Sequence, residues 1–316
     1  MSFRILSIDG GGVRGVVPAF FLSEYERLVG HQCAEEFDLL VGTSTGAIIA
    51  CGLALGISAR DLVEFYVRDA PKVFSWPFYL RPQLAKAMYK MVRPSYSLTT
   101  LREALDVAFG KRYLSNVRTE LRITVVDVGA GESHVFRSSD RNHKGFSAAA
   151  AVSCSCAAPT YFDCGVVGGM HYVDGGLWAN NPSMVAISEA VRIMGSFRPK
   201  ELRLVSLGCG GMEFYLHAAK MAKAGLIRWG VEVLPLMFEA QASATSSYLE
   251  WMLPTENYFR INPRLPEQLV SLDNRNVIPE LVSCARRLSN RYVEELLQKV
   301  PPRESDSEDD DYIPVT

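Results

Sequence analysis

The sequence lacks several features that would assign a protein class at once. No stretch of 18 apolar residues occurs among its 316 residues, so we expect no membrane-spanning helix. The amino terminus carries no signal peptide and leads directly into a predicted strand, which indicates a cytoplasmic protein. The net charge of −2 is too small an imbalance to favour binding to a nucleic acid polymer.

Cysteine is present but follows no disulfide or metal-binding pattern. There are seven cysteines, an odd number, and most of them lie in apolar runs. No pair of Cys-x-x-Cys motifs occurs, and Cys154 and Cys156 are too close together for a zinc knuckle. We therefore expect no metal site and predict buried free thiols in a reducing compartment.

The composition is that of an ordinary folded protein, with 48% hydrophobic and 22% charged residues. A chain of this length can form one large α/β domain with a sizeable core. Six acidic side chains occur within residues 304–311, shortly after the Pro301–Pro302 pair. We predict a single domain over residues 1–300 and an acidic, disordered tail over residues 301–316.

Strand, glycine-rich turn and apolar helix occur twice in succession near the amino terminus. Phe3–Ile8 leads into Gly10–Gly15 and a helix, and Phe37–Val41 leads into residues 42–46 and a helix that ends near Leu55. This order predicts an α/β fold with parallel strands. Further elements are predicted as strands at 121–128 and 202–207 and helices at 148–158, 183–194, 213–252 and 277–299.

Residues 42–46 read Gly-Thr-Ser-Thr-Gly, with Ser44 at the centre. A nucleophilic serine must project its hydroxyl group from a backbone without bulk, and glycines two residues away on either side allow the strained turn that this requires. The helix that follows directs its positive end toward a developing negative charge. The position between a strand and a helix favours a nucleophile over a simple helix-capping turn.

The loop Gly10–Gly15 fits two functions. It matches Gly-x-Gly-x-x-Gly, the dinucleotide-binding pattern, for which Glu35, Glu36 or Asp38 would be the ribose-binding acid. Its exposed backbone N–H groups at a helix start would also stabilise the oxyanion of a tetrahedral intermediate. We favour the oxyanion role, because a dinucleotide site has no use for the serine turn at Ser44.

A serine nucleophile needs a base, and none of the five histidines lies in a motif. His171 is close to Asp174 in sequence, but alternation along a strand places the two side chains on opposite faces. Asp174 ends an extended run and is followed by Gly175 and Gly176, which allow another backbone to approach closely. Burial would raise the pKa of this carboxyl group toward the range of a general base.

Three motifs in this order resemble the patatin-like phospholipase family. They are Asp-Gly-Gly-Gly-x-Arg-Gly at 9–15, Gly-x-Ser-x-Gly at 42–46 and Asp-Gly-Gly at 174–176, and the resemblance covers at least residues 3–190. It implies a three-layer α/β/α fold with a mostly parallel central sheet and helical lid segments. It also implies hydrolysis of fatty acyl esters of membrane phospholipids, without a metal or organic cofactor.

The resemblance further implies a role for each matching residue. Ser44 and Asp174 correspond to a Ser–Asp catalytic dyad that contains no histidine. The amides of Gly11 and Gly12 correspond to an oxyanion hole, and Gly10 shapes the turn. The residues that support this site are Arg14, Gly15, Gly42, Gly46, Gly175 and Gly176.

The size of the chain and the segments at 241–245 and 258–263 are similar to stand-alone bacterial members of this family. Some of these act in antiphage defence, where a cyclic nucleotide activates them to degrade the cell's own membrane. The resemblance thus implies a phospholipid substrate, peripheral contact with the inner face of the membrane and, as a hypothesis, a cyclic nucleotide activator. The sequence leaves homo-oligomerisation undetermined.

Residues 71–102 are rich in aromatic and basic side chains and contain no acidic one. They predict either a helical cap over the acyl pocket or a surface that lies on an anionic bilayer. Leu226–Phe238 also has two interpretations, since Trp229 and Leu236 fit either a lid or the core. Side chains expected to contact the bilayer are Trp76, Phe78, Tyr79, Lys86, Lys90 and Arg93.

Two further functions remain as alternatives at this point. An acyltransferase would use the same dyad, because an acyl-enzyme does not dictate the acceptor. A lipid- or nucleotide-binding regulator would have the fold without turnover.

Overall fold

The fold is built around one mixed sheet of eight strands. The computed structural model describes residues 2–75, 93–211, 223 and 225–303. The strand order is β5-β6-β3-β2-β1-β7-β8, with β4 paired to β3 outside this path. Five strands (β1, β2, β3, β7 and β8) are mutually parallel, and β4, β5 and β6 are antiparallel to their partners. The strands are β1 Phe3–Ile8, β2 Leu39–Thr43, β3 Glu120–Asp127, β4 Glu132–Arg137, β5 Gly165–Val167, β6 Met170–Asp174, β7 Leu202–Leu207 and β8 Tyr258–Ile261.

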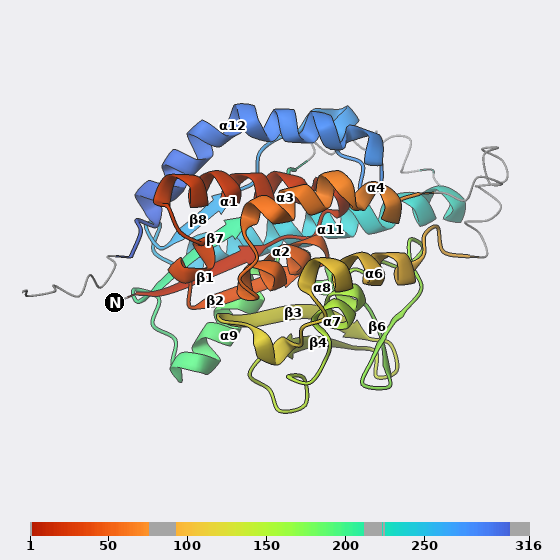
Figure 1. Ribbon diagram of the computed structural model, residues 1–316, viewed down its shortest axis with the longest axis horizontal. Helices are drawn as coiled ribbons and strands as arrows, with labels where there is room; N and C mark the ends of the chain where they lie inside the picture. Colours follow the sequence, from red (N-terminus) through yellow and green to blue (C-terminus); the bar gives the residue numbers. More distant parts are fainter. Residues whose placement is uncertain (1, 76–92, 212–222, 224, 304–316) are drawn as a thin grey trace, which may run out of the picture.

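Helices cover both faces of this sheet, which gives the three layers that the sequence predicts (Figure 1). Helices α1, α3 and α12 pack together over one face, while α9 contacts β1 and β2 on the other and packs against α11. None of the described helices combines the length and apolar character needed to span a bilayer. The helices are α1 Val16–Val29, α2 Thr45–Ala54, α3 Ala59–Arg68, α4 Ala70–Val73, α6 Leu98–Phe109, α7 Ala148–Ser155, α8 Gly176–Ala179, α9 Ser183–Met194, α11 Leu226–Met252 and α12 Ile278–Lys299.

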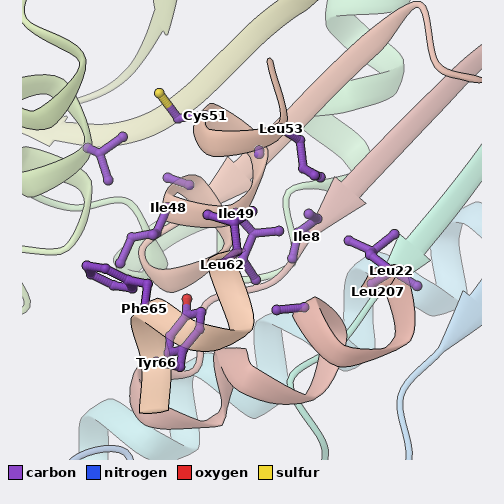
Figure 2. Close-up of a cluster of buried hydrophobic side chains, with 14 of the residues drawn as sticks. Ile8, Leu22, Ile48, Ile49, Cys51, Leu53, Leu62, Phe65, Tyr66 and Leu207 are labelled. Carbon is purple, nitrogen blue, oxygen red and sulfur yellow. The ribbon is translucent and has the colours of Figure 1, made fainter. Parts of the chain in front are cut away.

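The alternation of side chains along the strands creates two hydrophobic cores. In β1, Ile5 joins the core beneath α9, whereas Leu6 and Ile8 join the larger core on the opposite face. Figure 2 shows this larger core, in which Ile49 of α2 and Leu62 of α3 lie near Ile8. Every residue of α2 is buried, so the helix that follows the serine turn is held rigidly in the centre of the domain.

Two strands meet end to end along one edge of β3. Strand β4 occupies the opposite edge of β3, so β2 and β6 share the remaining edge. The last pair between β2 and β3 is Thr43 with Thr124, and the first pair between β6 and β3 is Asp174 with Val125. Because β6 is antiparallel to β2, both strands end at this point, which brings Ser44 and Asp174 together.

The main elements that the sequence predicts are confirmed, with shifts at several ends. The helix predicted over 148–158 ends earlier, at Ser155, because the amides of Ala157 and Ala158 donate to the carbonyl groups of Cys154 and Cys156 and not to those four residues earlier. Strands β4, β5 and β8 are not among the predicted elements. Two of them, β4 and β5, pair only with antiparallel neighbours, while β8 is the parallel edge strand beside β7.

Parts of three predictions lie outside the described residues. The first concerns the side chains expected to contact the bilayer, of which five are not described: Trp76, Phe78, Tyr79, Lys86 and Lys90. The cap and bilayer interpretations of residues 71–102 therefore stay predictions. The helix predicted from residue 213 is described from Leu226 onward. The acidic tail is described only to Arg303, whose amide and guanidinium groups hydrogen-bond to Glu36 and Asp38.

Candidate active site

Ser44 occupies a sharp turn between β2 and α2. Its backbone dihedrals are φ 54° and ψ −122°, a conformation that few non-glycine residues adopt and that often marks a functional site. A Cβ atom on Gly42 would collide with the backbone of Gly46, and one on Gly46 would collide with the backbone carbonyl of Ile8. Both glycines of the motif are therefore required by close packing around the turn.

Asp174 lies directly beside this serine at the end of β6. Its carboxyl group lies close enough to the Ser44 side chain for a favourable interaction and accepts a hydrogen bond from the Gly176 amide at 2.7 Å. Burial raises the pKa of Asp174 to about 7, and the Gly176 amide and the Ser44 side chain reduce this shift only in part. Gly175 allows the approach, because a Cβ atom there would collide with Thr124. The carboxyl group can thus accept a proton near neutral pH.

Three further side chains, which the sequence did not single out, hold the serine turn in place. The Ser155 hydroxyl accepts a hydrogen bond from the Ser44 amide at 2.9 Å and donates one to the Thr124 carbonyl at 2.7 Å. The Thr43 hydroxyl bonds to the Thr124 hydroxyl at 2.6 Å and to the Ala179 carbonyl at 2.5 Å. The polar residues at the ends of β2 and β3 were the only sequence signal for this arrangement.

The glycine loop forms part of the wall of the pocket that holds Ser44 and Asp174. The amide of Gly10 is already bonded to the Asn180 carbonyl, at 3.0 Å. In the described part of the chain, the amides of Gly11 and Gly12 donate to no protein acceptor, and both residues line the same pocket as Ser44. Gly12 has φ +57°, and a Cβ atom there would collide with the Leu272 carbonyl. Two free N–H groups next to the serine hydroxyl are suited to binding an anionic oxygen.

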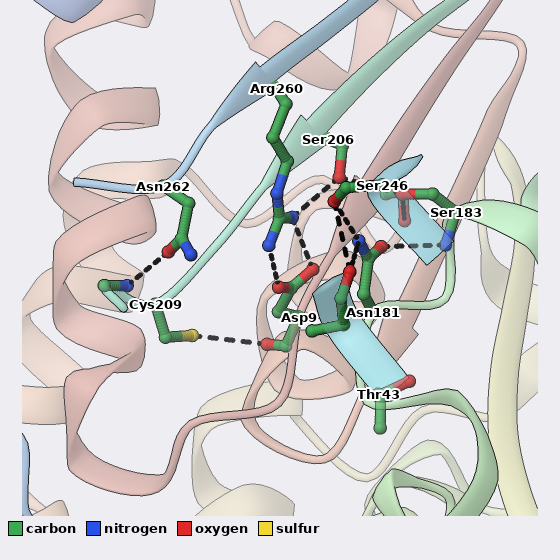
Figure 3. Close-up of polar contacts among 12 residues, drawn as sticks. Asp9, Thr43, Asn181, Ser183, Ser206, Cys209, Ser246, Arg260 and Asn262 are labelled. Atoms are coloured by element: carbon green, nitrogen blue, oxygen red, sulfur yellow. Dashed lines mark hydrogen bonds and ion pairs between the residues drawn. The ribbon is translucent and has the colours of Figure 1, made fainter. Parts of the chain in front are cut away.

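A buried ion pair and buried hydrogen bonds hold this loop in place, and Figure 3 shows the ion pair between Asp9 and Arg260. Arg260, on β8, binds both carboxylate oxygens of Asp9, at 2.8 and 2.5 Å. Burial raises the pKa of Asp9, and the positive charge of Arg260 opposes that rise. Arg14 is also buried and donates to the carbonyl groups of Gly11, at 3.3 Å, and Gly210, at 2.7 Å. Arg14 therefore contacts the loop backbone, and Arg260 is the partner of Asp9 that the sequence did not indicate.

A mostly apolar pocket opens above the site. Ser44, Asp174, Gly11 and Gly12 lie in its wall together with Cys156. Such a space is suited to an aliphatic chain and excludes water from the reacting groups. The principal apolar lining residues are Ile48, Phe65, Val73, Phe74, Leu101, Tyr161, Phe162, Leu234, Phe238 and Leu272.

The histidines lie elsewhere. His171 is exposed on β6, and His134 and His143 contact each other at 3.2 Å near the end of β4. None of the five is among the described residues that line the pocket. The described residues also contain no group of three metal-ligating side chains.

The dinucleotide alternative fails on the position of its acidic residues. Glu36 and Asp38 precede β2, whereas the glycine loop follows β1, and the two strands are parallel. The acids therefore lie at the opposite end of the sheet from the loop. Glu36 is bonded there to Arg4 and His31, and Asp38 accepts a hydrogen bond from the Arg4 amide.

Fold, pocket and serine turn together define a class of lipid ester hydrolases. The family described as patatin-like phospholipase matches residues 6–187, more than half of the chain, and the protein belongs to this family. The match contains all three motifs and both residues of the Ser44–Asp174 contact.

Relatives of known activity extend over more of the chain. A cGAMP-activated phospholipase of Vibrio cholerae is 30% identical over 323 aligned residues, which cover 90% of each protein. A cGAMP-activated phospholipase of Escherichia coli is 33% identical over 246 residues, covering 72% of this chain and 66% of the relative. Among solved structures, VipD from Legionella pneumophila aligns with 90% of this chain and 67% of its own, at 15% identity and a TM-score of 0.42.

Proposed function

We propose that the protein is a phospholipase in which Ser44 is the nucleophile and Asp174 the general base. The observation that carries this proposal is that the Asp174 carboxyl group lies beside the Ser44 side chain, in an apolar pocket that also holds two free backbone amides. A carboxyl group with a pKa of about 7 is matched to proton transfer near neutral pH. Ser44 therefore needs no histidine as its base.

The reaction follows from this geometry. Asp174 accepts the proton of Ser44 as the Ser44 Oγ attacks the acyl carbonyl carbon. The amides of Gly11 and Gly12 hold the oxyanion, and the alcohol of the lysolipid leaves with a proton from Asp174. A water molecule, deprotonated by Asp174, then hydrolyses the acyl-enzyme. Loss of one oxyanion donor typically costs about 3 kcal/mol of transition-state stabilisation.

The substrate is a membrane phospholipid. Aromatic and aliphatic side chains of the pocket would take up the acyl chain, and its carbonyl carbon would lie beside Ser44. Such a substrate requires the protein to bind the bilayer surface peripherally, at the inner face of the membrane. Acyl transfer to another alcohol uses the same acyl-enzyme and is distinguished by its products.

We further propose that a cyclic nucleotide activates the enzyme in antiphage defence. The relative that supports this is the cGAMP-activated phospholipase of Vibrio cholerae, which is similar over nearly the whole chain. A ligand of this kind activates an enzyme only if it binds the active conformation more tightly than the inactive one.

One experiment tests both parts. The protein is incubated with phosphatidylethanolamine–phosphatidylglycerol vesicles, with and without cGAMP, and the products are identified by mass spectrometry. We expect free fatty acid and lysophospholipid, formed faster with cGAMP and not formed by Ser44→Ala. Absence of hydrolysis under both conditions contradicts the phospholipase, whereas equal rates contradict only the activation. An acyl ester of an added alcohol as the main product would favour the acyltransferase.

A further inference from the structure

A second hollow lies on the opposite face of the sheet from the acyl pocket. It is formed by β3, the end of β4 with the loop that follows, and the last turn of α9. Half of the eight residues that line it are arginines, and only one, Asp140, is acidic. We call it the arginine hollow and define it by Arg122, Arg137, Arg141 and Arg192.

Two of these arginines are held in fixed positions by carboxylates: Glu189 binds both, and Glu120 also binds Arg122, at 2.7 Å. Glu189 of α9 binds Arg122 at 2.7 Å and Arg137 at 2.7 and 2.9 Å. Burial raises the pKa of Glu189, but its bonds to the two arginines outweigh this and leave the pKa below its usual value. The carboxylate therefore stays ionised and orients both guanidinium groups, a form of preorganisation that favours ligand binding.

The other two arginines have no such partner. Arg141 and Arg192 are exposed, and neither forms an ion pair with another described residue. The loop that carries Arg141 is nevertheless fixed, since Asp140 accepts a hydrogen bond from the Asn142 amide at 2.8 Å and the Arg137 amide donates to His143. The hollow thus presents two free cationic groups beside two oriented ones.

We propose that the arginine hollow is a binding site for a phosphate-bearing ligand. Guanidinium groups bind phosphate oxygens in pairs of parallel hydrogen bonds, and the exposed Arg141 and Arg192 lie here beside the half-buried Arg137 around a polar hollow. The exposed Ser139 and Asn142 on the rim provide further hydrogen-bonding groups. Two sources share this chemistry, namely a cyclic dinucleotide and the headgroup of an anionic phospholipid.

The hollow is linked to the active site through a single strand. Arg122 and Thr124 alternate with Leu121 and Ile123 and so share one face of β3. Thr124 in turn contacts Thr43 and Ser155, the residues that hold the Ser44 turn. A ligand that binds Arg137 would pull on the Glu189 carboxylate, which also holds the buried Arg122, and would therefore act on the strand that supports the nucleophile. This regulatory role rests on the proposed function, whereas binding itself does not.

Charge reversal at the two free arginines provides the test. The variant Arg141→Glu/Arg192→Glu is compared with the control Arg60→Glu/Arg287→Glu, which makes the same charge change at exposed positions on α3 and α12. Binding of cGAMP is measured by calorimetry, and binding of phosphatidylglycerol vesicles by sedimentation against phosphatidylcholine vesicles. Hydrolysis of a soluble short-chain ester monitors the intact active site.

We expect the hollow variant to bind its phosphate ligand at least about tenfold more weakly than the wild type, because each arginine contributes charge-assisted hydrogen bonds. The control variant should bind as the wild type does, and both should hydrolyse the soluble ester normally. Loss of cGAMP binding identifies the nucleotide as the source, and loss of vesicle binding alone identifies the headgroup. The proposed binding site is contradicted if the hollow variant binds as tightly as the wild type, or if the wild type binds neither probe. In either case, ester hydrolysis by the wild type would still support the phospholipase proposal.

Discussion

Ser44 and Asp174 lie beside each other in the wall of one pocket, although they are 130 positions apart in the sequence. The contact arises because β2 and the antiparallel β6 end head to head along the same edge of β3. Each residue is placed by a strand rather than by a flexible loop, so the distance between the hydroxyl and carboxyl groups is set by the register of the sheet. We expect the contact to be present before substrate binds.

The raised pKa of Asp174 predicts opposite effects of pH on activity and stability. Above about pH 7 the carboxylate is free to accept a proton, so kcat/KM should rise with pH and level off above that value. Folding favours the protonated form, because the pKa is about 7 in the folded protein, against 3.8 for an ordinary aspartate side chain. The free-energy cost of ionising the buried Asp174 carboxyl group is therefore absent at low pH. It destabilises the fold increasingly as the pH rises from about 4 through 7.

The variant Asp174→Asn isolates this effect, because the amide side chain keeps the shape and cannot ionise. At pH 8 it should be more stable than the wild type, by at most about 4 kcal/mol, and at pH 4 the two should be equally stable. Thermal unfolding at the two pH values measures the difference. A variant that is equally destabilised at both would show that the carboxylate is not held in a desolvated position.

The conformation of Ser44 predicts that the nucleophile carries a cost in stability. A non-glycine residue in so sparsely populated a region costs about 1–3 kcal/mol. Ser44→Ala and Ser44→Gly both remove the hydroxyl group and should be inactive, but only glycine relieves the strain. We expect Ser44→Gly to be about 1 kcal/mol more stable than Ser44→Ala in denaturant unfolding. Equal stabilities would mean that the turn is unstrained.

Ser155 is predicted to position the nucleophile without contacting the substrate. Ser155→Ala removes the acceptor for the Ser44 amide, so kcat should fall by about tenfold or more with little change in KM. Ser153 provides the control, since it is buried on the same helix and its hydroxyl bonds only to the carbonyl of Ala150 in its own turn. An equal loss of kcat in Ser153→Ala would assign the effect to the helix rather than to the hydrogen bond.

Substitution by alanine should lower activity at Gly12, in the closely packed glycine loop, but not at Gly30, although both glycines have positive φ. At Gly12, a Cβ atom would collide with the Leu272 carbonyl, and displacement of the loop should lower kcat/KM at least about a hundredfold. At Gly30, no atom lies within 4 Å of the added Cβ. Gly30→Ala should thus cost only about 1 kcal/mol of stability and leave activity unchanged. Normal activity of Gly12→Ala would exclude the loop from the oxyanion site.

The sequence pattern was sufficient for the fold class and for the residues that form the centre of the site. A strand followed by glycines and a buried helix is a pattern that can be recognised in the sequence, and each of the three motifs contains such glycines. The placement of Ser44 beside Asp174 was expected from the resemblance and not from local pattern, because it depends on the pairing of β6 with β3.

The residues that brace the site left no such signal. Ser155 lies in a run of small residues that reads only as a helix, and its role depends on the carbonyl of Thr124 from a distant strand. Arg260 and Leu272 reach the glycine loop from more than 240 positions away in the sequence. The arginine hollow combines β3, β4 and α9 and was not anticipated. Contacts of this kind are fixed by tertiary packing rather than by periodicity.

The central claim is that Asp174 activates Ser44, and the rate of covalent labelling by a fluorophosphonate tests it most directly. The reaction is followed by intact mass and peptide mapping across pH 5 to 9 for the wild type, Ser44→Ala and Asp174→Asn. We predict a single adduct on Ser44, a rate that rises with a midpoint near pH 7, no adduct in Ser44→Ala and labelling at least about a hundredfold slower in Asp174→Asn. Labelling of a different serine, or wild-type labelling rates in Asp174→Asn, would contradict the account.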